Sequence, residues 1–132
     1  HQPEFQELDI HLRADDGPLH VSMSPDRLHQ VLINLLRNAA DAPGVSRIRL
    51  DLSRSEDETI QLRCTDDGAG FTPVALERAF EPFFTTKDVG AGTGLGLSNC
   101  LAVIGQAGGT IEVSNTPESG ACVQIRWPSS QS

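Results

Sequence analysis

Apolar and polar residues alternate along six short stretches of the chain, which is the pattern of half-buried β-strands. The stretches are residues 7–13, 19–23, 46–52, 59–65, 110–114 and 121–127. The turn-forming sequence ADDGP separates the first two, SEDE the next two and NTPESG the last two. The pattern therefore predicts two short paired strands, a hairpin, and two final strands joined by a turn.

Two other segments follow the 3.6-residue period of a helix. Residues 25–42 begin after Ser24, a helix-capping residue, with proline at the first helical position. Their apolar face consists of Leu28, Val31, Leu32, Leu35, Leu36 and Ala39. Pro43-Gly44 is expected to end this helix. Residues 95–107 form a second predicted helix, which contains Gly105 at a cost of about 1 kcal/mol relative to alanine.

Residues 66–93 show no regular period apart from a helical turn in PVALERAF, and a loop this long in a compact domain is usually a lid or a disordered segment. Strands outnumber helices, so the helices can cover only one face of a sheet. We therefore predict an α+β fold, a two-layer α/β sandwich in which a mixed sheet carries about three helices on one face.

The amino-acid composition limits the kinds of molecule that the chain is expected to bind. A chain of 132 residues is long enough for one domain, so residues 1–132 are expected to form a single unit. Its formal charge is −8 and it has no lysine or arginine cluster, which argues against nucleic acid as a partner. Any phosphate must then be held by backbone, by metal or by a few cations. No apolar run has the length of a membrane span, so we expect no direct membrane contact; a membrane anchor upstream of residue 1 is left open.

The three cysteines, Cys64, Cys100 and Cys122, lack the close pairing of a zinc or redox site. They are expected to be reduced, as in a cytoplasm, and to act as small buried hydrophobic residues rather than functional thiols.

A polar stripe runs along the first predicted helix. Gln30, Asn34, Asn38 and Asp41 are spaced so that they share one face beside the apolar one. Amide oxygens suit a hard cation such as Mg²⁺, whose other ligands are waters and phosphate oxygens. An ordinary solvated helix face is the alternative.

The segment QVLINLLRNAADA resembles the asparagine-box helix of sensor histidine kinase catalytic domains. These belong to the ATPase superfamily that includes DNA gyrase, mismatch-repair ATPases and a heat-shock chaperone. The resemblance covers about residues 19–127 and implies the Bergerat ATP-binding fold. It implies that Asn38 ligates magnesium with Asn34 beside it at the metal site. Asp41 stands where many sensor kinases have lysine, so no phosphate contact is assigned to it; Arg37 lies either near the phosphates or on the surface.

The sequence Asp66-Asp67-Gly68-Ala69-Gly70 follows a predicted strand directly. A carboxylate at a strand end can accept a hydrogen bond from the exocyclic amine of adenine, and glycines let the backbone approach the ring closely. The sequence resembles the first glycine box of the same family, which makes Asp66 the adenine-reading residue, with Gly68 and Gly70 in the binding turn. Asp67 replaces the more common asparagine, a variant that leaves the acceptor at Asp66 untouched.

Residues 80–87 (FEPFFTTK) resemble the phenylalanine box, and residues 92–98 (GTGLGLS) the second glycine box. The resemblance makes residues 80–96 an ATP lid. Glycines ahead of a helix leave backbone N–H groups free to bind phosphate oxygens. Lys87, the only lysine in the chain, is the expected partner of the terminal phosphate. The nucleotide contacts expected here are Phe84, Thr85, Thr86, Lys87, Gly92, Thr93, Gly94, Leu95 and Gly96.

The resemblance implies a protein-histidine kinase that uses ATP and Mg²⁺, with Asn34 and Lys87 as catalytic candidates. ATPases of the superfamily place a glutamate base where this chain has Asn34, and an amide cannot accept that proton. We therefore expect transfer to a neutral imidazole instead of efficient hydrolysis. Two alternatives are an ATP-gated dimerisation clamp, as in gyrase, and a nucleotide-binding module without catalysis.

None of the four histidines, His1, His11, His20 and His29, stands in the sequence setting of a phosphoacceptor. The acceptor is expected on a separate dimerisation domain that precedes residue 1. The implied partners are that histidine domain and, through a homodimeric full-length kinase, a response regulator. The expected location is the cytoplasm, with inner-membrane anchoring of the full-length protein left open.

Overall fold

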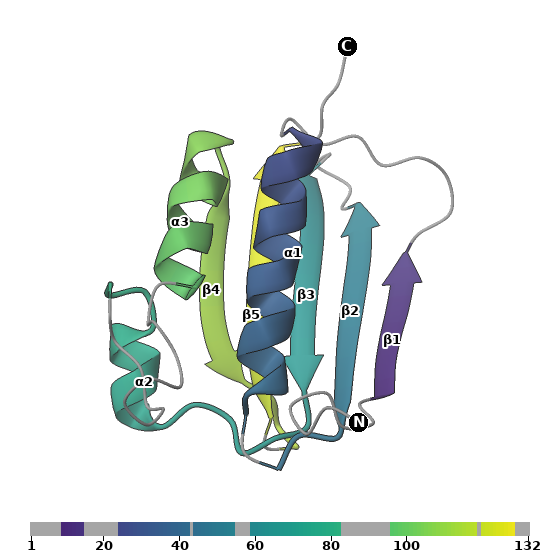
Figure 1. Cartoon of the computed structure of the whole chain (residues 1–132), viewed down its shortest axis with the longest axis vertical. Coiled ribbons are helices and arrows are strands. Elements are labelled where there is room, and N and C mark those ends of the chain that lie inside the picture. Colours follow the sequence, from purple (N-terminus) through teal and green to yellow (C-terminus); the bar gives the residue numbers. More distant parts are fainter. Residues whose placement is uncertain are drawn as a thin grey trace.

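The computed structural model describes residues 9–14, 24–42, 44–54, 59–82, 96–118 and 120–128. In these residues five strands form one sheet in the order β1-β2-β3-β5-β4 (Figure 1). The strands are β1 (Asp9–Ala14), β2 (Arg47–Arg54), β3 (Thr59–Asp66), β4 (Thr110–Asn115) and β5 (Ala121–Pro128). Each of them matches a stretch of alternating residues, so the predicted strand periodicity is confirmed at these positions.

The sheet is mixed, as predicted. β1 runs parallel to β2, with Ile10 opposite Ile48, while every other neighbouring pair is antiparallel. The hairpins of residues 46–65 and 110–127 are confirmed by the β2–β3 and β4–β5 pairings. The predicted strand at 19–23 lies outside the described residues.

The helices begin and end at recognisable signals. In α1 (Pro25–Ala40), Ser24 Oγ accepts a hydrogen bond from Arg27 N, and Asp41 caps the C-terminus. In α2 (Pro73–Arg78), Thr72 accepts from Ala75 N, so the turn predicted in PVALERAF is a short helix. The third helix is α3 (Gly96–Gln106). The first helix ends two residues earlier than predicted, before a turn in which Gly44 has a φ of +76°.

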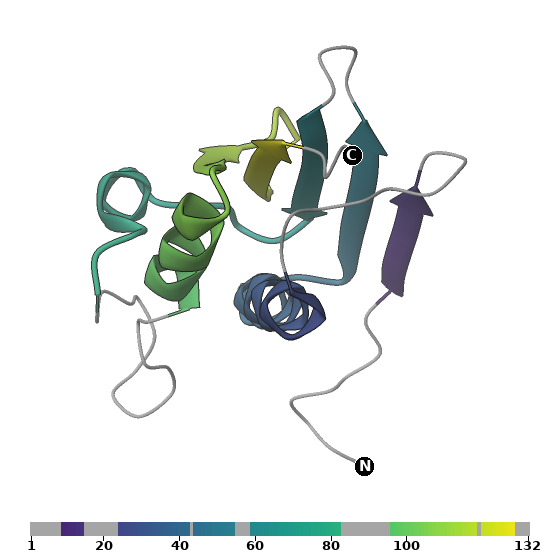
Figure 2. The same cartoon turned by 90° about the horizontal axis from the view of Figure 1, so that it is seen from above.

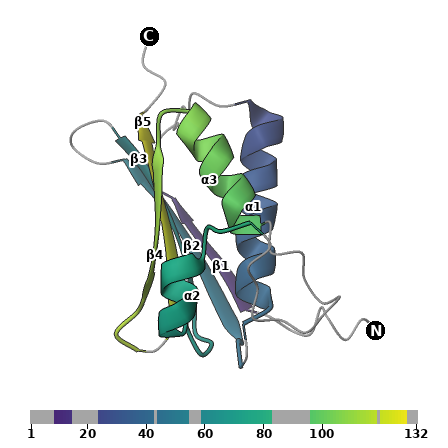
Figure 3. The ribbon, with the colours of Figure 1, turned by 90° about the vertical axis from the view of Figure 1, so that its left-hand side faces the viewer.

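Two layers enclose one core. Helices α1 and α3 lie on one face of the sheet and α2 lies toward the β4 edge, while the other face carries no described helix (Figures 2 and 3). Inward residues of the central strands, such as Ile60, Ile125 and Trp127, pack with Leu35 of α1 and Ile104 of α3. None of the helices in the described residues is long and apolar enough to cross a bilayer. The predicted two-layer sandwich is confirmed.

Candidate functional site

The asparagine stripe of α1 is partly covered by neighbouring structure. Gln30 is exposed, whereas Asn34 and Asn38 are half-buried. Asn34 Oδ1 accepts a hydrogen bond of 3.2 Å from Gln30 Nε2, and Asn34 Nδ2 is buried without a partner among the described residues. The Asn38 side chain has no hydrogen bond within the described part of the chain. Asn34 Oδ1 is thus already engaged and its Nδ2 faces the contact with Cys100 of α3, so Asn38 is the amide of this pair that is left to bind a polar ligand.

Asp66 occupies the last position of β3, opposite Ile48 on β2. Its Oδ1 accepts hydrogen bonds from Gly68 N at 2.9 Å and from Ala121 N at 3.3 Å. These two backbone donors fix the carboxylate while leaving Oδ2 without a partner among the described groups. A half-exposed carboxylate with one oxygen fixed and one available can accept a hydrogen bond from a ligand amine.

The glycine turn after β3 is held from the β4–β5 side. Asn115 Oδ1 accepts from Phe71 N at 2.7 Å, and Asn115 Nδ2 donates to Phe71 O at 2.9 Å. Gly70 has a φ of +81°, and a Cβ at this position would lie 2.9 Å from Asn115 Oδ1. Gly120 approaches still more closely, because a Cβ there would lie 1.7 Å from the Asp66 carbonyl oxygen. The turn therefore needs glycine on both sides of the contact.

The neighbouring acid, Asp67, holds the other side of the turn. Its Oδ1 accepts from the backbone N–H groups of Ser46 and Arg47 at 2.8 and 2.9 Å, and its Oδ2 accepts from Ser46 Oγ at 2.7 Å. Asp67 N also donates to Arg47 O. The bond from the Ser46 hydroxyl, followed by the two backbone bonds, lowers the pKa of Asp67 to about 2. The carboxylate is therefore ionised across the physiological pH range.

α3 packs against α1 close to the asparagine pair. Cys100 of α3 lies fully buried beside α1, with its Sγ 3.9 Å from Val31 O. Burial raises the pKa of Cys100 to about 11, an effect that the neighbouring Asn34 side chain partly opposes. In Cys64 of β3, burial and then the charge of Asp66 raise the pKa to about 12. All three thiols are buried and free, so they act as small apolar side chains.

The predicted site residues within the described ranges come from elements that share one end of the fold. The C-terminal ends of α1 and β3 and the N-terminal end of α3 all point toward the lower part of Figure 1. These ends carry Asn38, Asp66 and Gly96, respectively, and Gly68 and Gly70 follow β3 directly. Among the described residues, a Cβ at Gly96 would meet nothing within 4 Å, so none of them fills the space beside the first turn of α3.

The remaining predicted contacts lie outside the described residues. They are Phe84, Thr85, Thr86, Lys87, Gly92, Thr93, Gly94 and Leu95, which make up most of the predicted lid at 80–96. In the described part of the chain no three His, Cys, Asp or Glu side chains gather as a metal site. A divalent ion held by the described residues would therefore depend on amide oxygens and on oxygens of its ligand.

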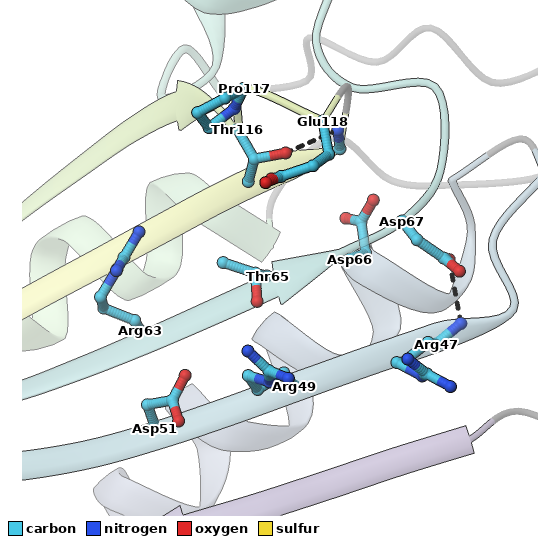
Figure 4. Close-up of a pocket in the computed structure, with 11 residues that line it drawn as sticks. Arg47, Arg49, Asp51, Arg63, Thr65, Asp66, Asp67, Thr116, Pro117 and Glu118 are labelled. Carbon is cyan, nitrogen blue, oxygen red and sulfur yellow. Dashed lines mark hydrogen bonds between the residues drawn. The ribbon is translucent and has the colours of Figure 1, made fainter.

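A shallow pocket of about 450 Å³ lies on the open face of the sheet, away from α1 and α3 (Figure 4). Arg47, Arg49 and Asp51 line it because they alternate along β2 with the buried Ile48 and Leu50. Of the predicted site residues that the structure describes, only Asp66 borders it. Three arginines share this pocket with Asp51, Asp66, Asp67 and Glu118, so its charge is mixed. The asparagine pair, by contrast, lies on the helical side of the sheet.

Sequence reasoning missed the residues that support the glycine turn. Ser46, Asn115 and Gly120 lie 20 to 54 positions from Asp66 along the chain, and no local pattern marks them. For Asp67 the sequence offers one signal, its place in the first glycine box.

Three characterised proteins are similar in sequence to most of this chain. Two-component sensor PprA of Pseudomonas aeruginosa is 46% identical over 128 residues, which is 92% of this chain and 14% of PprA. C4-dicarboxylate transport sensor protein DctB of the same species is 42% identical over 89% of this chain and 20% of its own length. Sensor histidine kinase ZraS of Salmonella typhimurium is 37% identical over 95% of this chain and 27% of ZraS. The chain thus spans a minor part of these relatives.

Solved structures show the same fold. The nucleotide-free catalytic domain of histidine kinase ThkA superposes with a TM-score of 0.79 at 32% identity, covering 92% of this chain and 79% of that one. Full-length ShkA in complex with AMPPNP gives a TM-score of 0.81 at 25% identity, covering 95% of this chain and 26% of ShkA. Residues 23–131 match the family described as histidine kinase-, DNA gyrase B- and HSP90-like ATPase. The chain belongs to this ATPase family, and its relatives are sensor histidine kinases.

Proposed function

We propose that this chain is the catalytic and ATP-binding domain of a sensor histidine kinase, which transfers the γ-phosphate of Mg-ATP to a histidine on a separate dimerisation domain. The observation that carries the proposal is Asp66, whose carboxylate is fixed through Oδ1 and has Oδ2 available at the edge of the glycine turn. This edge lies at the same end of the fold as the asparagine pair of α1. One end of a ligand can thus meet the Asp66 carboxylate and the other end the Asn38 amide, beside Asn34.

Each residue type has a distinct role in this proposal. Asp66 accepts from the exocyclic amine of adenine, while Gly68 and Gly70 let backbone approach the base. The amide oxygen of Asn38 ligates Mg²⁺, with Asn34 beside it; the ion when bound neutralises phosphate charge. Lys87 contributes the cation for the terminal phosphate within a lid formed by residues 80–96, and Phe84, Thr85, Thr86 and Gly92 to Gly96 complete the nucleotide contacts.

Asn34 favours histidine as the acceptor. An amide has no proton-accepting capacity near neutral pH, so Asn34 cannot act as the general base that hydrolysis of ATP by water would need. Its Oδ1 is already engaged by Gln30. A neutral imidazole is itself nucleophilic and needs no such base. In this proposal the acceptor lies on a partner domain of a homodimeric, cytoplasmic kinase unit that passes the phosphate to a response regulator.

Calorimetric titration of the chain with ATP, with and without Mg²⁺, tests the binding part of the proposal. Asp66→Ala is expected to weaken ATP binding about tenfold or more in either condition and to reduce the preference for ATP over GTP, because it removes a charged hydrogen-bond acceptor. Asn38→Ala is expected to lose only the gain in affinity that magnesium provides. Glu112→Ala, an exposed acid on β4, is the matched control. Absence of heat with millimolar ATP and magnesium, or wild-type binding by both site variants, would refute the assignment.

A further inference from the structure

Asp67 joins two parts of the chain that are far apart in sequence. Its carboxylate accepts three hydrogen bonds from Ser46 and Arg47, and its own N–H donates to Arg47 O. Ile48 and Asp66 form the last pair of the β2–β3 ladder, so Asp67 extends that ladder by one residue. The side chain then closes the contact against the segment that leads into β2.

That segment is itself fixed to the end of α1. Asp41 N donates to Arg37 O at 3.1 Å, and Ala42 N donates to Ala39 O at 3.1 Å. Val45 N donates to Ala42 O at 3.2 Å, and the Val45 side chain packs against the core. Asp41, Ala42 and Val45 are thus linked by backbone hydrogen bonds to one another or to the last turn of α1. This last turn carries Asn38.

The opposite flank of the glycine turn is held by a different part of the fold. Asn115 pairs with both backbone groups of Phe71, and Gly120 contacts the backbone of Asp66. These contacts tie the turn to the β4–β5 hairpin rather than to the segment that follows α1. Among the described contacts of the turn, the bonds of Asp67 are the ones that lead to the asparagine helix.

We propose that Asp67 is a positioning residue that sets the spacing between the adenine-reading Asp66 and the metal-binding Asn38. The inference rests on the function proposed above and adds a residue that touches neither nucleotide nor metal. Its hydrogen bonds hold the glycine turn to the segment that follows α1. Asp66 and Asn38, which bind opposite ends of one ligand, are thereby kept at a fixed spacing. The affinity for a ligand that must contact both residues depends on that spacing.

The magnesium gain, defined as the ratio of the ATP dissociation constant in EDTA to that in Mg²⁺, reports the spacing. Metal-free ATP does not require the Asn38 amide, whereas Mg-ATP requires both ends of the site. Asp67→Ala is expected to reduce the magnesium gain about tenfold, the size of effect seen when supporting partners of a metal ligand are removed. The dissociation constant of metal-free ATP should change much less.

Asp67→Asn is the rescue variant. Its amide oxygen can accept from both backbone N–H groups and its amide nitrogen can donate to the Ser46 hydroxyl, so the magnesium gain should stay within about twofold of wild type. Ser46→Ala removes one bond and should give a smaller loss in the same direction as Asp67→Ala. Glu112→Ala removes an equal charge elsewhere and should leave the magnesium gain unchanged.

Calorimetry supplies the dissociation constants, and fluorescence of the buried Trp127 verifies that each variant is folded. A wild-type magnesium gain in folded Asp67→Ala would overturn the positioning role while the proposed function stands. An equal loss in Asp67→Asn would also overturn it, since charge alone would then be responsible. If Asp67→Ala fails to fold, an unchanged gain in Ser46→Ala decides against the inference. Failure of wild type to bind Mg-ATP would instead refute the proposed function.

Discussion

The Asp67 carboxylate lies exposed to solvent and still has a pKa of about 2, because Ser46 and Arg47 direct three donors at it. Hydrogen bonds to the charged form stabilise that form only while the carboxylate is ionised. The same residue appears in the sequence as a departure from a more common asparagine. Both side chains offer an oxygen to the backbone N–H groups at the start of β2, which explains why either can stand at this position.

Acid titration tests the state of this carboxylate. The folded pKa lies below the ordinary value of 3.8, so the contribution of Asp67 to stability is complete above the unfolded pKa and is lost as the pH falls through the folded one. The advantage of wild type over Asp67→Ala in free energy of unfolding should therefore be constant above about pH 5 and shrink between about pH 4 and 2. Urea denaturation at a series of pH values measures it. A difference that stays constant down to pH 2 would contradict the assigned hydrogen bonds.

Asn34 limits which reaction of its family this chain can catalyse. The ATPases that the sequence resembles use a glutamate base at this place, whereas an amide offers no proton acceptor. In this fold its Nδ2 is buried without a described partner, at the contact between α1 and α3. The position is thus polar and sheltered but not basic, which agrees with a proposed acceptor that supplies its own nucleophile.

At the scale of elements, α1 combines two functions along one helix. Its apolar face packs Val31, Leu35 and Ala39 into the core. Its polar stripe is not the uniformly solvated face that was the alternative, because Asn34 and Asn38 are half-buried while Gln30 is exposed. Helical spacing fixes which residues share a face; the neighbouring helix α3 decides how far that face is covered.

Alanine substitutions at two glycines in different elements are expected to change stability in opposite directions. In Gly120→Ala the new Cβ would lie 1.7 Å from the Asp66 carbonyl oxygen, so the turn must move, and we expect destabilisation of about 1–3 kcal/mol or more. In Gly105→Ala the Cβ meets nothing within 4 Å inside α3, and we expect stabilisation of about 0.5–1 kcal/mol from helix propensity. Denaturation followed by Trp127 fluorescence measures both. Equal effects of the two substitutions would show that the turn accepts a side chain.

At the scale of the whole molecule, the proposed nucleotide site lies at one end of the fold and draws on both layers, while one face of the sheet carries no described helix. His29 of α1 is exposed and is not one of the predicted site residues. The relatives are several times longer than this chain, so segments outside it have room for a phosphoacceptor.

A phosphotransfer assay with the histidine domain added as a separate protein tests whether the acceptor lies outside this chain. With radiolabelled ATP and Mg²⁺, the chain alone should incorporate no phosphate, and a phosphoacceptor histidine domain from a sensor kinase relative should become labelled when it is added. Asn38→Ala should reduce labelling at least about tenfold, since the metal ligand is lost, while Glu112→Ala should match wild type. Rapid labelling of the chain by itself would contradict a separate acceptor.

The secondary structure could be predicted because its signals are local. Alternation and helical spacing gave the described strands and helices within about two residues, and Ser24-Pro25 marked the start of α1. The pairing of β1 with β2 could not be predicted in this way, because parallel partners are joined by a long crossover. The support given to the glycine turn by Asn115 and Gly120 is equally non-local.

The sequence by itself determined the periodicity of each element, the order of the family motifs and the residue types offered to a ligand, because these depend on neighbours along the chain. Only the tertiary structure decided that Asp67 joins the glycine turn to the segment after α1, that Asn115 and Gly120 hold its other side, and that the Asn34 amide nitrogen is buried beside α3. Such contacts depend on packing between elements distant in sequence, which brings hydrogen-bond partners together without leaving a local pattern.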